Sequence, residues 1–90
     1  MNYELAKELD NAGFPIRVGN RVGYVQSPQL GELIEACGDR FGSLYRFNDD
    51  PEWYAYRAGT RTKEHGEFDG KTPEEAVARL WLALNKKNPL

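Results

Sequence analysis

The stretch from Phe41 to Ala58 constrains the fold of this chain most. It is rich in aromatic residues, and the run Asn48-Asp49-Asp50-Pro51 divides it into two parts. Aromatic residues favour strands, whereas Asn, Asp and Pro favour turns. The pattern therefore predicts two antiparallel strands, 41–48 and 52–58, joined by that turn.

The second predicted strand has bulky side chains on both of its faces. Its central run is Trp53-Tyr54-Ala55-Tyr56, and successive side chains of a strand point to opposite faces of the sheet. A sheet with one solvent-exposed face should instead alternate apolar and polar residues. Either helices cover both faces, which would give a layered α/β/α sandwich, or one aromatic face is exposed and binds a ligand. Three helices are enough to cover both faces of a small sheet, so we favour the sandwich.

Two amphipathic helices are expected in the first half of the chain, each with apolar residues at helical spacing. The first covers about 2–12 and stops before Gly13, since glycine readily adopts the left-handed conformation that ends a helix. The second takes Ser27 as its N-cap and Pro28 as its first residue, and it ends at Gly38.

The third helix has the clearest start signal in the sequence. The run Thr72-Pro73-Glu74-Glu75 combines an N-cap, a proline at the first helical position and a capping-box glutamate. Four apolar residues then share one face and should be buried. They are Val77, Leu80, Trp81 and Leu84.

The remaining strands are less clearly marked. Residues 17–26 fit a short hairpin that turns at Gly19-Asn20, or a loop that ends in a single strand over 22–26. A third strand of the aromatic sheet is expected over 61–68, with a bulge at His65-Gly66.

The expected fold is a single α+β domain over residues 1–90. Three helices pack on a small, mainly antiparallel sheet of three to five strands, in the order αββαβββα, with the α/β/α sandwich as a layered variant. A chain of 90 residues with one cysteine forms no internal disulfide, so such a small domain must be held by its core.

Composition argues against several classes of function. The formal net charge is −2, so the chain as a whole does not attract nucleic acid or anionic lipid. No apolar run approaches the roughly 20 residues of a transmembrane helix, and residues 1–8 do not resemble a secretory signal. We therefore expect a cytoplasmic protein with no membrane partner.

The candidate reactive residues have structural explanations. Cys37 lies on the apolar face of the second helix, and His65 is the only histidine, so neither a metal site nor a Cys–His pair is expected. The carboxyl pairs Asp49-Asp50 and Glu74-Glu75 belong to a turn and a helix cap. The sequence predicts no catalytic residue, no cofactor and no metal.

Basic residues are interleaved with aromatic residues between positions 40 and 63. Such a mixture is typical of surfaces on which single-stranded nucleic acid stacks, although the aromatic residues are also needed for the core. The candidate contact residues of this alternative are Arg46, Arg57, Arg61, Lys63, Tyr54 and Tyr56.

A second candidate surface follows from the third helix. Leu82 and Ala78 lie away from its apolar face, beside Arg79, and Tyr3 is similarly placed on the first helix. Isolated exposed apolar residues are ordinary on protein surfaces. Alternatively, the third helix is buried on two sides, by its own sheet and by another chain.

Parts of the chain resemble small uncharacterised proteins of bacteriophages and prophages. The similarity covers residues 28–85, chiefly the run from Leu33 to Phe41, the run Trp53-Tyr54-Ala55 and the closing helix from Gly70 to Leu84. Some of these proteins are grouped as phage α/β/α-sandwich domains. The resemblance implies an origin in a mobile element and action in the cytoplasm of a bacterial host, and it supplies no catalytic residues.

These observations lead to three hypotheses of function. The leading one is a non-enzymatic accessory protein of phage type that binds another protein. Binding of single-stranded nucleic acid by residues 40–63 is the alternative, and a small-ligand binder or enzyme ranks third. Self-association is compatible with all three.

Overall fold

The computed structural model describes residues 3–14, 20–22, 25–59 and 66–85, with the backbone alone for 20–22 and 25–27. The elements follow the predicted order αββαβββα, which confirms the α+β class. In sequence they are α1 (Tyr3–Asn11), β1 (Asn20–Val22), β2 (Val25–Ser27), α2 (Leu30–Cys37), the 3₁₀ turn η1 (Gly38–Arg40), β3 (Phe41–Arg46), β4 (Trp53–Arg57), β5 (Glu67–Gly70) and α3 (Pro73–Asn85).

The strands form two separate antiparallel sheets rather than one. β1 pairs with β2, and the order in the larger sheet is β3-β4-β5. In the larger sheet Leu44 lies opposite Ala55, which lies opposite Phe68. Tyr45 and Tyr54 form the neighbouring pair. The predicted hairpin between the two aromatic strands is therefore confirmed.

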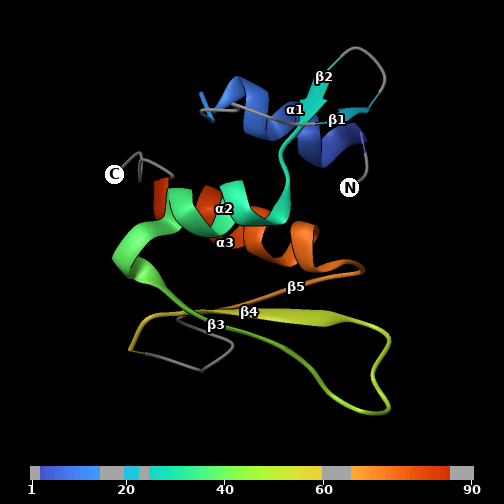
Figure 1. The fold of residues 1–90 in the computed structure, drawn as a ribbon, viewed down its shortest axis with the longest axis vertical. Helices are drawn as coiled ribbons and strands as arrows, with labels where there is room; N and C mark the ends of the chain where they lie inside the picture. The colour runs from blue at the N-terminus through green and yellow to red at the C-terminus, as the bar shows by residue number, and fades with distance from the viewer. Residues whose placement is uncertain (1–2, 15–19, 23–24, 60–65, 86–90) are drawn as a thin grey trace.

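The helices lie on one side of the larger sheet (Figure 1). α3 packs directly on the sheet, α2 packs on α3, and α1 with the β1–β2 hairpin lies beyond them. The described structure is thus not the α/β/α sandwich that we favoured, since no described helix covers the outer face of the sheet. The second interpretation, an exposed aromatic face, fits better because Tyr45 and Phe47 are 42% and 53% exposed.

The hydrophobic core lies between these layers. Its most completely buried large side chains are Leu9, Leu33, Val77, Leu80 and Cys37. Ala55 is the sheet residue at its centre, because the small side chain lets α3 approach β4 closely. One connected cluster therefore joins α1, α2, α3 and the sheet.

The end of α1 illustrates how local sequence leads to packing. Gly13 has a φ of 80°, as the predicted helix stop requires. The Phe14 N–H donates to the Leu9 carbonyl at 3.0 Å, a bond typical of a glycine-ended helix. This turn directs Phe14 into the core, where its ring meets Trp81 edge to face at 4.8 Å.

The predicted start of α2 is wrong by two residues. Ser27 pairs with Asn20 as the last residue of β2, so the N-cap is Gln29, whose N–H donates to Glu32 Oε1 at 3.1 Å. The turn predicted at Gly19-Asn20 is also wrong, because Asn20 is the first residue of β1 and pairs with Ser27. Because Val22 pairs with Val25, the connection falls at 23–24, whereas Gly19 lies outside the described residues.

The start of α3 agrees with prediction. Thr72 Oγ1 accepts the Glu75 N–H at 3.2 Å, and Pro73 is the first helical residue. The third strand of the sheet exists, but its described part begins at Glu67 and ends at Gly70, later than predicted. Residues 61–65, including His65 and its expected bulge, lie outside the description.

Candidate functional site

Helix α3 is buried on two sides by its own chain. It packs on β4 and β5 on one side and on α1 and α2 on the other. Ala78 is consequently fully buried, and its prediction as a partner contact is wrong. The sequence suggested a second buried side of this helix, and the two N-terminal helices account for it within the monomer.

The other three predicted contact residues are accessible. Arg79 and Tyr3 are exposed, and Leu82 is half-buried against the edge of the core. Leu82 and Arg79 meet at one site, whereas Tyr3 lies elsewhere on α1. The sequence thus identified two residues of a shared surface and two that do not belong to it.

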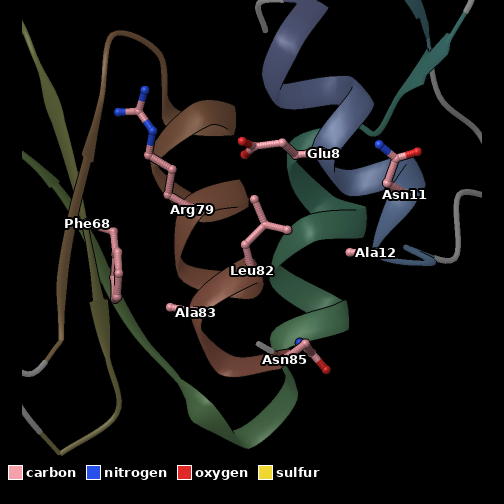
Figure 2. A pocket seen from close by; sticks show the side chains of 8 residues that line it. All are labelled: Glu8, Asn11, Ala12, Phe68, Arg79, Leu82, Ala83 and Asn85. Atoms are coloured by element: carbon pink, nitrogen blue, oxygen red, sulfur yellow. The ribbon is translucent and has the colours of Figure 1, made fainter. Parts of the chain in front are cut away.

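That shared surface is an open pocket with a volume of about 670 Å³. It runs along α3 between α1 and β5 (Figure 2). Eight residues line it, namely Glu8, Asn11, Ala12, Phe68, Arg79, Leu82, Ala83 and Asn85.

The pocket combines an apolar floor with a polar rim. Ala12, Phe68, Leu82 and Ala83 supply the apolar surface. Phe68 faces α3 from the sheet in Figure 2, while Leu82 points toward α1. Because the side chains come from three elements that are distant in sequence, their meeting depends on the tertiary fold.

Two of the polar rim residues are held by hydrogen bonds. Arg79 Nη1 donates to the Asp69 carbonyl at 2.5 Å, which ties α3 to β5. Asn85 Nδ2 donates to the Trp81 carbonyl at 2.9 Å within α3. These bonds fix the orientation of polar groups at the pocket before any ligand binds.

Sequence reasoning missed six of the lining residues. Phe68 falls in the predicted strand 61–68 with no sign of which face of the sheet it occupies, and Glu8, Asn11 and Ala12 fall near the end of the predicted first helix. The strand period gives Phe68 the same face as the core residue Ala55, to which it is paired. That register was the one available signal, but it required the strand pairing to be known.

The outer face of the sheet carries the second candidate surface. Tyr45, Tyr54 and Tyr56 lie on this face by register, and Phe47 continues it. Their rings contact one another, with Phe47 and Tyr54 edge to face at 5.5 Å and Tyr45 and Phe47 stacked at 6.4 Å. Tyr56 is buried, so the accessible part is the end near the β3–β4 turn.

The arginines do not share that face with the tyrosines. Arg46 pairs with Trp53 and Arg57 pairs with Phe41, positions that alternate with the tyrosines along the strands. Arg46 Nε also donates to the Asp50 carbonyl at 3.5 Å. Among the described residues, the basic and the aromatic side chains that the sequence interleaves therefore lie on opposite faces of the sheet. Arg61 and Lys63 lie outside the described residues.

Acidic side chains accompany the rings instead. Tyr54 Oη donates to Asp50 Oδ2 at 2.5 Å, and Tyr56 Oη donates to Glu67 Oε2 at 3.0 Å. The first bond lowers the pKa of Asp50 and raises that of Tyr54 to about 12. A hydrogen bond to Asp69 raises the pKa of Glu52.

The candidate reactive residues have the structural places that were predicted for them, where they are described. Cys37 is buried on α2, and this burial raises the pKa of its thiol to about 11, although Arg40 partly opposes the shift. A thiol with so high a pKa is a poor nucleophile at neutral pH. Within the described ranges, no group of three or more Asp, Glu, His or Cys side chains is placed to bind a metal ion.

None of the described helices combines the length and the apolar character that crossing a bilayer requires. No protein-family model, curated protein sequence or solved structure matches the chain. The relation to phage proteins stays a prediction.

Proposed function

We propose that this chain is a non-enzymatic binding protein, and that the pocket between α1, α3 and β5 accepts a short amphipathic segment of another protein. The observation that carries the proposal is the position of Leu82. This apolar side chain lines the same open pocket as Phe68, together with charged and amide groups.

The composition of the pocket favours a peptide over a polar metabolite. Half of its lining residues are apolar, and the charged ones are Glu8 and Arg79. A helix or turn that presents apolar side chains at positions i and i+3 or i+4 fits an apolar floor with a polar rim. Asn11 and Asn85 can hydrogen-bond to the polar side of such a segment.

The geometry also favours binding without large rearrangement. The pocket walls are two helices and a strand that share one hydrophobic core with the rest of the chain. Rigid walls reduce the entropy that is lost when a ligand binds. An enzyme would need reacting groups in the pocket, and Arg79 is already engaged by the Asp69 carbonyl.

A selection from a display library of random peptides tests the proposal. The folded protein should enrich peptides with apolar residues at helical spacing. In NMR titrations these peptides should shift the backbone amides of Ala12, Phe68, Leu82 and Ala83. Leu82→Glu should weaken their binding at least about tenfold, because it places a charge on the apolar floor.

Two further variants make the result decisive. Leu82 touches the core, so Ala83→Glu, at an exposed lining residue, should weaken binding without loss of stability. Asn48→Glu adds the same charge in the exposed β3–β4 turn and should leave binding unchanged. Enrichment of no peptide, or equal binding to all three variants, would contradict the proposal.

A further inference from the structure

We infer that the exposed end of the outer sheet face is a second binding surface, and that its ligand is an arginine side chain of a partner polypeptide. This surface, the aromatic shelf, consists of Tyr45, Phe47 and Tyr54. It is distinct from the α3 pocket, because the tyrosines lie on strand positions that alternate with those facing α3.

The exposure of the shelf is the first observation. Phe47 is 53% exposed and is the most exposed large apolar side chain among the described residues. It is nevertheless held in place, since its ring contacts both Tyr45 and Tyr54. Aromatic rings that are ordered and accessible offer flat π faces to a ligand.

The charge beside the shelf is the second observation. By register Asp69 lies opposite Tyr54 on β5, on the same face of the sheet. The Asp50 carboxylate accepts the Tyr54 hydroxyl, and Glu52 forms a hydrogen bond with Asp69. Three acidic residues therefore border the rings at one end of the sheet.

In the part of the chain that the structure describes, two arginines lie near the shelf, and both donate hydrogen bonds to backbone carbonyls. Arg79 donates to the Asp69 carbonyl, and Arg46 donates to the Asp50 carbonyl from the opposite-face position on β3. A bond to a neutral carbonyl leaves the charge of each guanidinium in place, and Arg79 acts electrostatically on Glu52. The three acidic residues Asp50, Glu52 and Asp69 still outnumber these two arginines, so the described groups at the shelf carry an excess of negative charge. This charge repels a phosphate backbone and attracts a cation.

A guanidinium group fits both observations. It stacks on aromatic faces, which attract cations, and its planar donors match carboxylate oxygens. A lysine ammonium would meet the charge but would not stack in the same way. The shelf therefore fits an arginine-containing segment of a partner protein better than an oligonucleotide.

NMR titrations with three probes test this inference. The probes are a short glycine–arginine peptide with amidated ends, the same peptide with citrulline in place of arginine, and oligothymidylate. The arginine peptide should shift the amides of Tyr45, Phe47, Tyr54 and Asp69. The uncharged citrulline peptide should bind about three- to fivefold more weakly, as expected for loss of an exposed cation–π contact.

Variants of the full chain localise the binding. Phe47→Ser should weaken the arginine peptide about three- to fivefold, and Phe47→Tyr should retain it. Tyr3→Ser removes another exposed ring, on α1, and should have no effect. The Ala83→Glu variant of the α3 pocket should also bind normally, which separates this surface from the proposed function.

Several outcomes would overturn the inference. Equal binding of the arginine and citrulline peptides would show that the charge is not recognised. An unchanged affinity after Phe47→Ser would exclude the shelf. Absence of binding, or stronger shifts of the same amides by oligothymidylate, would exclude arginine as the ligand.

Discussion

At the scale of single residues, the polar groups beside Tyr54 connect the β3–β4 turn to the sheet. Asp50 accepts the Glu52 N–H at 2.9 Å as well as the Tyr54 hydroxyl. These bonds favour ionised Asp50 and neutral Tyr54. The stability that Asp50 contributes is therefore present above its usual pKa and is lost as the pH falls through its lowered value.

The contributions of Tyr54 and Glu52 to stability depend on pH in the opposite direction to that of Asp50. Their folded-state pKa values are raised, so each contributes stability at low pH that is lost as the pH rises through the folded value. For Tyr54 this loss lies near pH 12, beyond neutral conditions. For Glu52 the loss begins above its ordinary value of 4.5, where its charge meets that of Asp69.

Glu52→Gln should accordingly raise thermal stability at neutral pH. Glutamine is always neutral and can still donate a hydrogen bond to Asp69, whereas ionised Glu52 cannot. The difference in melting temperature between variant and wild type should shrink below pH 4.5, where Glu52 becomes protonated in both the folded and unfolded states. Calorimetry of both proteins at neutral pH and below pH 4.5 measures this difference in melting temperature.

The control for this prediction is Glu35→Gln. Glu35 is exposed on α2, so its substitution changes the net charge equally without touching the cluster. If Glu35→Gln gave the same gain at neutral pH, the gain would come from net charge and not from the Glu52–Asp69 contact.

At the scale of elements, the sequence predicted best those features that depend on neighbours along the chain. The N-cap at Thr72, the stop at Gly13 and the turn between β3 and β4 all follow from local chemistry. The predicted start of α2 was wrong because Ser27 suits either the N-cap of a helix or the end of a strand. Pairing with Asn20 decided between them, and pairing between strands is not visible in local composition.

The candidate site was predictable only in part for a related reason. Leu82 stood out because it broke the apolar face of its own helix. Phe68 and Ala12 did not stand out, because they line the pocket only through their tertiary position near α3, which local sequence does not show. Ala78 broke the same pattern as Leu82 and was misassigned, because the sequence could not show which face α1 and α2 would cover.

The junction between β5 and α3 leads to a prediction about Gly70. A Cβ atom there would lie 2.5 Å from the Ala76 nitrogen and 2.8 Å from the Glu75 Cβ. Backbone atoms cannot move aside without shifting the helix, so Gly70→Ala should lower the free energy of unfolding by about 1–3 kcal/mol. Urea denaturation followed by circular dichroism measures the loss.

Gly31→Ala is the matched substitution for this test. A Cβ at Gly31 in α2 would meet no atom within 4 Å, and alanine favours helices over glycine by up to about 1 kcal/mol. This variant should be as stable as the wild type or slightly more stable. Equal losses for both variants would mean that the close approach at Gly70 is not the cause.

At the scale of the whole molecule, α3 is the element on which the layers depend. The sheet packs on one side of it, and α1 and α2 pack on the other. The α3 pocket lies at the edge where α1, α3 and β5 come together, whereas the aromatic shelf lies on the outer face of the sheet. Two proposed partners could therefore bind without competing for the same residues.

This architecture predicts that α1 and the larger sheet unfold together, although α2 and α3 lie between them. Leu9 on α1 is fully buried in the cluster that also contains Leu80 and Ala55. Leu9→Ala should lower the free energy of unfolding by about 2–5 kcal/mol, because it leaves a cavity in that shared core. Amide exchange should accelerate in β4 as well as in α1, since cooperative unfolding exposes both. Faster exchange confined to α1 would instead show that the N-terminal layer opens alone, and that the pocket wall formed by Glu8, Asn11 and Ala12 can detach from α3.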